Sequence, residues 1–285
     1  MKRLLAIFLV LLLALTGCSG SKDSETDQIE DSKETETEKT SEKGEKEKDN
    51  IIVTDNGEEI DISNYEEDTD LINYEFLELD DGTYAITKYN GSVKYLILPT
   101  EFDGKKVTEV SGAFRHSSLV GVIIPEGYIE ISGNCFQDST KLETVIMADS
   151  ITILGSNGYG HFEECSSLKN IRLSRGLTEI TNDMFKECTS LETMYIPGNI
   201  QLIDDDAFDD CESLESVTFE EGIIEIDSRP FAGNEMLYDI YLPESVTYIE
   251  GDFTNIHPNV TFHVVEGSYA EQYANEHSFR VEYTD

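Results

Sequence analysis

A sequence period of about 23 residues constrains this chain more than any other feature. Leucines, with one valine, recur at this period with a single longer step. Phenylalanines recur at nearly the same steps, including the longer one. The first column is Leu119, Leu142, Leu168, Leu191, Leu214, Leu237 and Val260, and the second is Phe114, Phe136, Phe162, Phe185, Phe208, Phe231 and Phe253. Two columns with one period indicate structural repeats.

Each repeat has a single apolar side. In residues 191–211, Met194 and Ile196 alternate as a short strand with one buried face. A Pro-Gly turn follows, then a second extended stretch ending near Ile203, after which Phe208 points inward from a turn or short helix. One such unit cannot bury its apolar side alone, so the units must stack. We therefore predict a β-rich solenoid of short parallel strands, with one coil for each period.

The repeats resemble the BspA-like (Treponema pallidum-type) bacterial leucine-rich repeats, whose unit reads roughly L-x-x-[IV]-x-[IL]-P-x-x-[VI]-T-x-I-x-x-x-A-F-x-x-C-x-x-L. Residues 237–249 and 177–191 follow this pattern closely, and the resemblance spans about residues 76–283. It implies a leucine-rich-repeat solenoid. It implies no particular ligand, because a solenoid is a platform for many partners.

Both ends of a stack need caps. We predict a repeat domain over 71–285, comprising an N-terminal cap (71–95), repeats (96–259) and a C-terminal cap (260–285). The first cap is expected to be a strand–turn–strand around Asp81–Gly82. The second is expected to hold a helix whose capping box begins at Ser268.

The N-terminus carries a targeting sequence. A basic start precedes an apolar run from Leu4 to Leu15, which is shorter than the ~20 residues of a membrane-spanning helix. The following residues up to Cys18 resemble a bacterial lipobox. The resemblance implies a lipoprotein signal peptide over 1–17 and lipidation of Cys18. The alternative is an ordinary secretory signal with a chance cysteine.

Residues 18–70 are predicted to be a lipidated cysteine followed by a disordered acidic tether. Residues 19–70 hold six lysines and 20 acidic residues, a net charge of −14 (6 − 20), and residues 19–50 contain one aliphatic side chain, Ile29. Such a segment buries too little apolar surface to fold, and its charge extends it. The formal charge of the chain, −39, argues against a nucleic-acid partner.

Three cysteines share one slot in successive repeats. Cys165, Cys188 and Cys211 lie one period apart and are expected to stack about 4.8 Å apart, a spacing that a disulfide tolerates. Buried free thiols are favoured, because small hydrogen-bonding residues fill the slot in other repeats: Ser117, Ser139 and Asn234. Cys135 is expected to be a core residue.

No set of side chains typical of a catalytic, metal or cofactor site stands out. The histidines form no His-x-x-x-His pair, and the chain has no Cys-x-x-Cys motif, nucleophile elbow or phosphate-binding glycine loop. Asp204–Asp206 with Asp209–Asp210 suit calcium chemically, but their spacing matches no EF-hand loop, so a solvated turn is favoured. The insertion Gly155–Gly160 likewise favours a surface loop over a ligand loop. No enzyme activity, cofactor or metal is predicted.

The outward side of the predicted strands is the candidate binding surface. One outward column, called the strip below, is Ile123, Ile146, Arg172, Tyr195, Thr218 and Tyr241. Its smaller neighbours are Gly121, Thr144, Asn170, Thr193, Ser216 and Asp239. Apolar and aromatic residues beside small polar ones suit contact with a protein or glycan. The same residues are also common strand formers. Arg172, Tyr195 and Tyr241 are expected in solvent, facing a neutral or cationic partner.

These features together predict a non-enzymatic bacterial lipoprotein, anchored in the cell membrane by lipid and facing the extracellular side. Its solenoid would bind a protein or glycan at the cell surface, or serve in adhesion, as a monomer. The alternative is a structural or assembly subunit of a cell-envelope complex. A hydrolase is disfavoured because no catalytic set is present.

Overall fold

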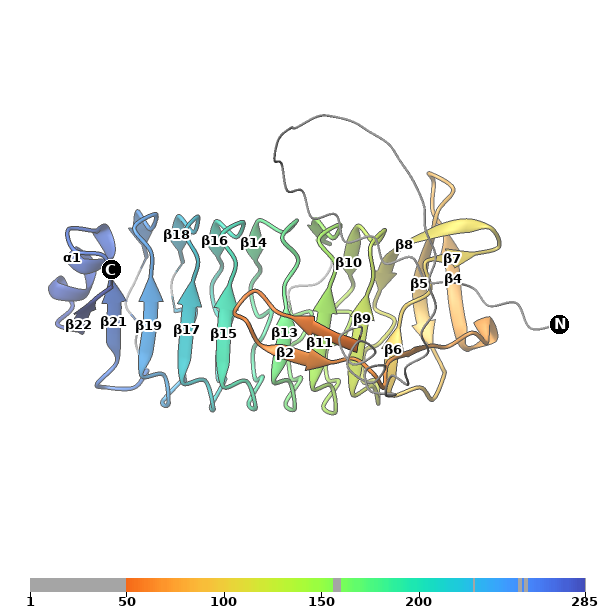
Figure 1. Ribbon diagram of the computed structural model, residues 1–285, viewed down its shortest axis with the longest axis horizontal. Coiled ribbons are helices and arrows are strands. Elements are labelled where there is room, and N and C mark those ends of the chain that lie inside the picture. The colour runs from red at the N-terminus through yellow and green to blue at the C-terminus, as the bar shows by residue number, and fades with distance from the viewer. Residues whose placement is uncertain (1–49, 156–159, 228, 251–252, 254–255, 285) are drawn as a thin grey trace, which may run out of the picture. The chain divides into compact units, whose positions relative to one another are not determined.

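The computed structural model describes residues 50–284 except 156–159, 228, 251–252 and 254–255. The expected signal peptide, Cys18 and most of the expected tether lie outside these residues, as does the middle of the Gly155–Gly160 insertion. The described residues belong to one compact unit, residues 45–285. It is a solenoid of short strands, stacked along one axis from the N-terminal to the C-terminal side (Figure 1).

One wall of the solenoid, called face A below, consists of two five-stranded ladders in which every strand pair is parallel. The first ladder is β13 (Asn170–Arg172), β11 (Thr144–Met147), β9 (Gly121–Ile124), β6 (Tyr95–Ile97) and β3 (Glu66–Glu67). The second is β15 (Thr193–Ile196), β17 (Ser216–Phe219), β19 (Asp239–Leu242), β21 (Thr261–Val264) and β22 (Arg280–Tyr283). The predicted solenoid of parallel coils, one for each sequence period, is confirmed.

A second wall, face B, is also divided into two sheets. The first comprises β4 (Tyr74–Glu78), β5 (Tyr84–Tyr89), β8 (Lys105–Ser111), β10 (Glu130–Ser132) and β12 (Ile153–Leu154), with β7 (Glu101–Phe102) paired to β8. The second is β14 (Glu179–Ile180), β16 (Leu202–Ile203), β18 (Glu225–Ile226) and β20 (Tyr248–Ile249). Within the described residues no pairing joins β12 to β14, and the longer coil that carries the insertion lies between them.

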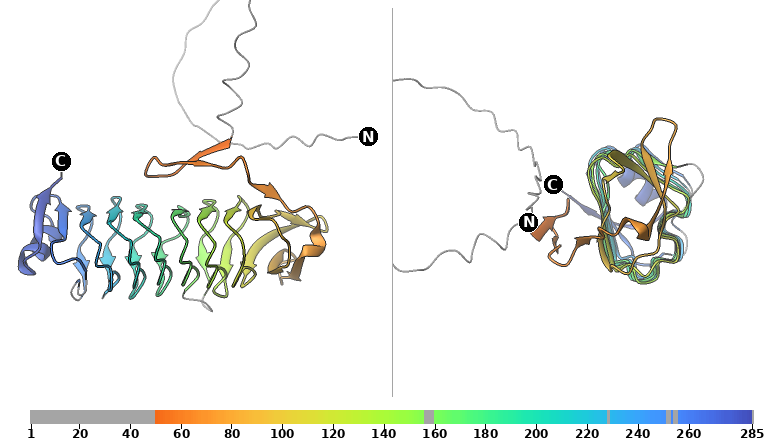
Figure 2. Two further views of the ribbon diagram at one scale, coloured as in Figure 1. Left: turned by 90° about the horizontal axis from the view of Figure 1, so that it is seen from below. Right: turned by 90° about the vertical axis from the view of Figure 1, so that its right-hand side faces the viewer.

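A continuous stack of phenylalanine rings runs through the core. The rings of the phenylalanine column are stacked from Phe114 to Phe253, with centroids 5.1 to 5.9 Å apart and interplanar angles of 6° to 17°. The backbone repeats with the rings: the amide of Phe208 donates to the carbonyl of Pro230 at 2.8 Å, and that of Phe185 donates to Ala207 at 2.8 Å. Seen along the axis, the coils superpose (Figure 2). The column predicted from the period is therefore the spine of the core.

Most phenylalanines of the column lie in turns with left-handed backbone nearby. For Phe208 the flanking residues are Asp206, with φ of 53°, and Asp210, with φ of 54°. The residue two positions after the phenylalanine has left-handed backbone in six coils: His116, Asp138, Glu164, Glu187, Asp210 and Gly233. Aspartate, asparagine and glycine adopt this conformation more readily than most residues. The acidic run near Phe208 thus has a conformational role in the turn.

Side chains in the cysteine slot donate hydrogen bonds to backbone carbonyls of the preceding coil. The Cys165 thiol donates to the carbonyl of Phe136 at 3.1 Å, and the Cys188 and Cys211 thiols bond the next two phenylalanine carbonyls in the same way. Ser139 and Asn234 supply the equivalent bonds at 2.7 and 2.9 Å. All the cysteines of the described residues are buried and free, as favoured from the sequence. Burial raises the pKa of Cys135 and Cys165 to about 12, so these thiols are unreactive.

Both ends of the stack are closed by local structure. At the front, β4 and β5 pair antiparallel across the Asp81–Gly82 turn. At the back, α1 (Tyr269–Glu276) begins at Ser268, whose hydroxyl accepts from the Glu271 amide at 3.1 Å, and β22 then adds in parallel to β21. None of the helices among the described residues is both long and apolar enough to cross a membrane.

Residues 50–70 were expected to belong to a disordered tether, but the structure shows strands there. This part of the chain forms the hairpin of β1 (Ile51–Val53) and β2 (Glu59–Asp61), then β3, and leads into a 3-10 turn (Leu71–Asn73). β3 is already part of face A, since Glu66 and Glu67 pair in parallel with Leu96 and Ile97 of β6. Composition predicts disorder here, but one isoleucine, Ile60, is only 7% exposed and anchors the segment.

Emptying one site in the phenylalanine stack tests the fold. We expect Phe208→Ala to lower the free energy of unfolding by about 3–5 kcal/mol, because it leaves a cavity between two stacked rings. Urea unfolding of the full chain measures it. Tyr248→Ala, an exposed aromatic truncation on face B, is the matched control and should change stability by about 0.5 kcal/mol or less. Equal stability losses in the two variants would contradict a core held by the ring stack.

Candidate functional site

The strip predicted on face A is in register, in two segments. Ile123, Ile146 and Arg172 are paired partners on β9, β11 and β13, and Tyr195, Thr218 and Tyr241 are partners on β15, β17 and β19. No pairing joins β13 to β15 in the part of the chain that is described, so the ladder is interrupted between Arg172 and Tyr195. The column also continues to residues that were not predicted: Glu67 and Ile97 at one end, His263 and Glu282 at the other. His263 follows Tyr241 by nearly one period, so the period itself could have found it.

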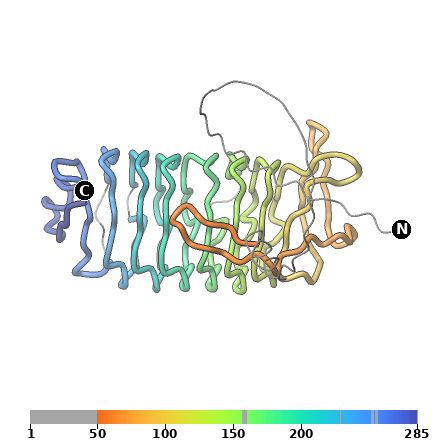
Figure 3. The backbone as a smooth tube through the Cα atoms, viewed as in Figure 1, coloured from red at the N-terminus to blue at the C-terminus, as the bar shows by residue number. Residues whose placement is uncertain are grey.

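The first segment of the strip is less exposed than expected. Ile146 is only 5% exposed. The chain before the solenoid passes over this region of face A (Figures 1 and 3). Tyr65, just ahead of β3, lies so close to Gly121 that a Cβ there would be 2.2 Å from the tyrosine oxygen. Burial raises the pKa of Tyr65 to about 12. The absence of a side chain at Gly121 therefore makes room for the covering segment.

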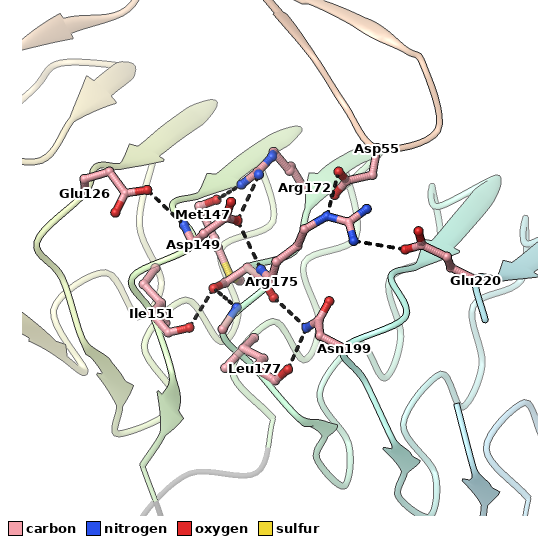
Figure 4. A network of polar contacts seen from close by, with 12 residues as sticks. Asp55, Glu126, Met147, Asp149, Ile151, Arg172, Arg175, Leu177, Asn199 and Glu220 are labelled. Atoms are coloured by element: carbon pink, nitrogen blue, oxygen red, sulfur yellow. Dashed lines mark hydrogen bonds and ion pairs between the residues drawn. The ribbon is translucent and has the colours of Figure 1, made fainter. Parts of the chain in front are cut away.

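Arg172 is not the solvent-exposed side chain that was expected. Its guanidinium donates to the carbonyl of Met147 and to the carboxylate of Asp149, the latter at 2.9 Å (Figure 4). The Arg172 side chain is 18% exposed. The same Asp149 carboxylate also accepts from the backbone amide of Arg175 at 3.1 Å. Arg172 thus braces the turn that follows β11 in the preceding coil, and only part of its surface is available to a partner.

Arg175 is the functional candidate that the sequence interpretation missed. Its Nε donates to Asp55 of the β1–β2 hairpin at 3.1 Å, and its Nη1 lies 3.1 Å from a carboxylate oxygen of Glu220 (Figure 4). The Gly198 amide, and then Arg175, lower the pKa of Glu220. Two carboxylates from distant parts of the chain therefore meet at one guanidinium. Sequence spacing gave no signal for this, because Arg175 lies in the turn after the strand.

A narrow crevice separates the hairpin from face A beside these ion pairs. Its lining includes Asp55 and Asn56 from the hairpin, and Lys169, Arg172 and Tyr195 from the solenoid. Tyr195 is half-buried, and burial raises its pKa. The middle of the predicted strip is thus occupied by the protein's own N-terminal hairpin.

The far end of the strip presents a different arrangement. The Tyr241 ring stacks on His263, with centroids 4.1 Å apart and an interplanar angle of 9°. A ring nitrogen of His263 lies 2.7 Å from the Asp239 carboxylate. Tyr241 and Thr218 remain half-exposed. This end combines a flat ring with polar neighbours, as binding surfaces for proteins and glycans often do.

The other candidate groups of the sequence have structural environments. Asp209 lies 3.2 Å from the Lys186 ammonium, and Arg229 lies 3.7 Å from Asp205 and 3.6 Å from Asp206, so the neighbouring coils supply cations to the acidic turn. Within the described residues no group of three or more His, Cys, Asp or Glu side chains is arranged to hold a metal ion. His161 is fully buried in the position that Met184 and Ala207 take in later coils.

Comparison with known proteins agrees with the fold. A model of the BspA type leucine rich repeat region matches in six copies over residues 108–161 and 158–261. The chain belongs to this family. Curated proteins gave no match.

Solved structures of other bacterial repeat proteins are similar to this BspA-type chain. The Treponema pallidum leucine-rich repeat protein is 25% identical, with a TM-score of 0.60, over 76% of this chain and 98% of that one. A leucine-rich cell-surface protein of Faecalibacterium prausnitzii is 28% identical, with a TM-score of 0.55, over 67% of this chain and 53% of that one. A Bacteroides ovatus repeat protein, 22% identical over 69% of this chain and 61% of that one with a TM-score of 0.51, shares the fold. Family and fold together favour a protein-binding scaffold.

His161 gives a pH test of the core. Neither ring nitrogen has a hydrogen-bond partner in the described structure, and burial lowers its pKa from 6.5 to about 4. Between these pH values the unfolded chain binds more protons than the folded one, so stability falls as the pH falls from about 6.5 to about 4. We expect His161→Met to remove roughly 3 kcal/mol of the stability loss between pH 7 and pH 4. Urea unfolding of parent and variant at both pH values measures the difference. If parent and variant lose the same stability between pH 7 and pH 4, the histidine is in a solvated or paired environment.

Proposed function

We propose that this protein is a non-enzymatic bacterial cell-surface lipoprotein that uses face A to bind a macromolecule, with adhesion as one use of that binding. The observation that carries the proposal is the strip. Tyr195 and Tyr241 are half-exposed aromatic side chains on a rigid ladder, with polar or charged neighbours. Aromatic and arginine side chains on a preformed surface are the residues that most often dominate binding energy. A protein or glycan partner fits this chemistry.

The proposed anchor is the lipid on Cys18. The signal peptide over 1–17 and the acidic residues that follow support export and attachment, with the solenoid held away from the membrane surface. A diacylglyceryl group supplies two acyl chains, and stable anchoring requires two such signals. In this proposal the repeat domain is monomeric, because one solenoid already carries the complete strip.

Assembly within the cell envelope is the second candidate function. It is favoured by apolar side chains on face B and its edge: Ile129, Ile153, Ile224 and Tyr248 are each 45% exposed. A partner of the same cell could cover this side permanently without contacting face A. Apolar side chains left exposed on a soluble surface often mark such contacts when they cluster.

The strip is tested by removing both tyrosines. We expect Tyr195→Ala/Tyr241→Ala to weaken binding by tenfold or more in a screen of the full chain against cell-wall fragments, a glycan array and purified matrix proteins, because two flat contacts are lost at once. Tyr248→Ala on face B is the matched control and should bind like the parent. The melting temperatures of all three proteins are compared first. Undiminished binding by the double variant would exclude the strip as the site, and loss in Tyr248→Ala alone would favour the assembly function.

The anchor is tested at Cys18. We expect Cys18→Ala to leave the protein unprocessed or released into the medium, because no acyl chain can be attached. Membrane fractionation and mass spectrometry of the N-terminus measure the outcome, with Cys135→Ala as a control that removes a buried thiol instead. A Cys18→Ala protein that is cleaved normally and stays with the membrane would contradict the lipoprotein proposal.

A further inference from the structure

The β1–β2 hairpin is not a coil of the solenoid, yet it lies on face A. The turn of the hairpin is fixed internally, since the Thr54 and Glu58 backbones bond each other at 2.8 Å. Its one ion pair to the repeats, among the described residues, joins Asp55 to Arg175, which are 120 positions apart in the chain. Figure 2 shows the hairpin outside the stack, alongside the wall formed by the face A strands. It is therefore an addition to a solenoid that already closes without it.

The contact joins opposite charges in a chain that is otherwise acidic. Residues 51–70 contain eight acidic residues and no basic one. Residues 71–285 contain 12 basic and 39 acidic residues, and three of those 12 fall within seven positions: Lys169, Arg172 and Arg175. All three lie at or beside the crevice under the hairpin. A wholly acidic segment thus covers the densest group of basic side chains in the repeat domain.

The hairpin is held weakly compared with the coils. It has three residue pairs, Ile51 is 39% exposed and Val53 is 58% exposed. Only Thr54 and Ile60 are buried between residues 51 and 61. An isolated two-stranded hairpin is marginally stable in water. Its order therefore depends on contact with face A, and loss of that contact releases the segment without opening the core.

The site under the hairpin has the features of a peptide-binding surface. It offers a guanidinium that already holds two carboxylates, an ammonium, and a half-buried tyrosine, on strands interrupted between β13 and β15. The segment seated on it is acidic and extended. Guanidinium groups bind carboxylates with directional hydrogen bonds, so the site selects for acidic side chains rather than for charge alone.

We propose that face A around Arg172, Arg175 and Tyr195 binds an extended acidic polypeptide of a partner protein, and that the chain's own hairpin, residues 50–62, occupies this site until the partner displaces it. The proposal rests on the proposed function and specifies its partner and its regulation. The hairpin acts as an intramolecular competitor. A tethered segment is present at an effective concentration of about 1 mM. The apparent affinity for a competing partner is therefore the intrinsic affinity multiplied by the fraction of sites that the hairpin leaves open.

The probe is a fluorescent synthetic peptide of residues 50–70, added to the full chain and followed by anisotropy. Asp55→Asn weakens the hairpin contact in the chain, whereas the peptide keeps its own Asp55. We expect the peptide to bind the Asp55→Asn protein at least tenfold more tightly than the parent. Glu59→Gln removes the same charge from an exposed position with no ion pair in the described structure, and should bind like the parent. Adding Arg175→Gln to Asp55→Asn should abolish the gain.

Hydrogen exchange of residues 51–61 gives a second measurement. We expect these amides to exchange faster in the Asp55→Asn protein, or when the peptide saturates the parent, while amides of β15 and β17 stay protected. A scrambled peptide of the same composition should bind at least tenfold more weakly than the native sequence, and binding should fall as salt rises.

Three outcomes would overturn the proposal. The first is equal peptide affinity for the parent and the Asp55→Asn protein, and the second is equal affinity for native and scrambled peptides. The third is a concentration-dependent dimer of the Asp55→Asn protein in sedimentation, which would make a second copy the occupant. If one of these outcomes occurs but the Tyr195→Ala/Tyr241→Ala protein still loses partner binding, only the competition by the hairpin is excluded and the proposed function stands. If the peptide binds as expected but the Tyr195→Ala/Tyr241→Ala protein binds its partner like the parent, the strip is excluded as the binding site.

Discussion

Every coil of this protein has to match the next coil position by position, and the rest of the structure follows from that constraint. A phenylalanine ring packs between the rings above and below it, and its amide bonds the following coil. The slot three positions later bonds the carbonyl of the preceding phenylalanine, whether the residue is Cys211 or Asn234. Each inward position therefore accepts only two kinds of side chain. One kind stacks on the same residue type in the next coil, and the other hydrogen-bonds to the next coil, about one strand spacing away. Such a stack gains stability only through its neighbours, which is why both ends carry caps.

The parts of the fold set by this constraint could be predicted, and the parts set by single distant contacts could not. The leucine and phenylalanine columns and the Ser268 helix start are all visible in local spacing or turn chemistry. The hairpin at residues 51–61 was missed because its composition resembles a tether and its ion pair to the repeats is with Arg175, far along the chain. Arg172 was placed in solvent because period alone does not reveal its bonds to Met147 and Asp149.

Average charge and local charge favour different partners for this chain. A net charge of −39 favours a neutral or cationic partner when it is spread evenly. The described cations are instead concentrated beside acidic groups, as Lys186 is beside Asp209 and Arg175 beside Asp55 and Glu220. Screening limits the field of distant carboxylates to about 10 Å in ordinary salt, so a ligand at Arg175 experiences mainly these neighbours. The local field, which the sequence average conceals, is what an approaching segment meets.

The positions free to carry function are those that the period leaves unspecified. The phenylalanine column is invariant within the chain, whereas the strip changes from Ile146 to Arg172 to Tyr195 over consecutive coils although its backbone is equally regular. Outward side chains on a solenoid wall do not have to stack, so their identity is available for recognition. The interruption between β13 and β15 falls where this variation is greatest and where the hairpin is seated. A regular stack supplies the rigidity, and the irregular stretch on face A supplies a surface that differs from the other described coils.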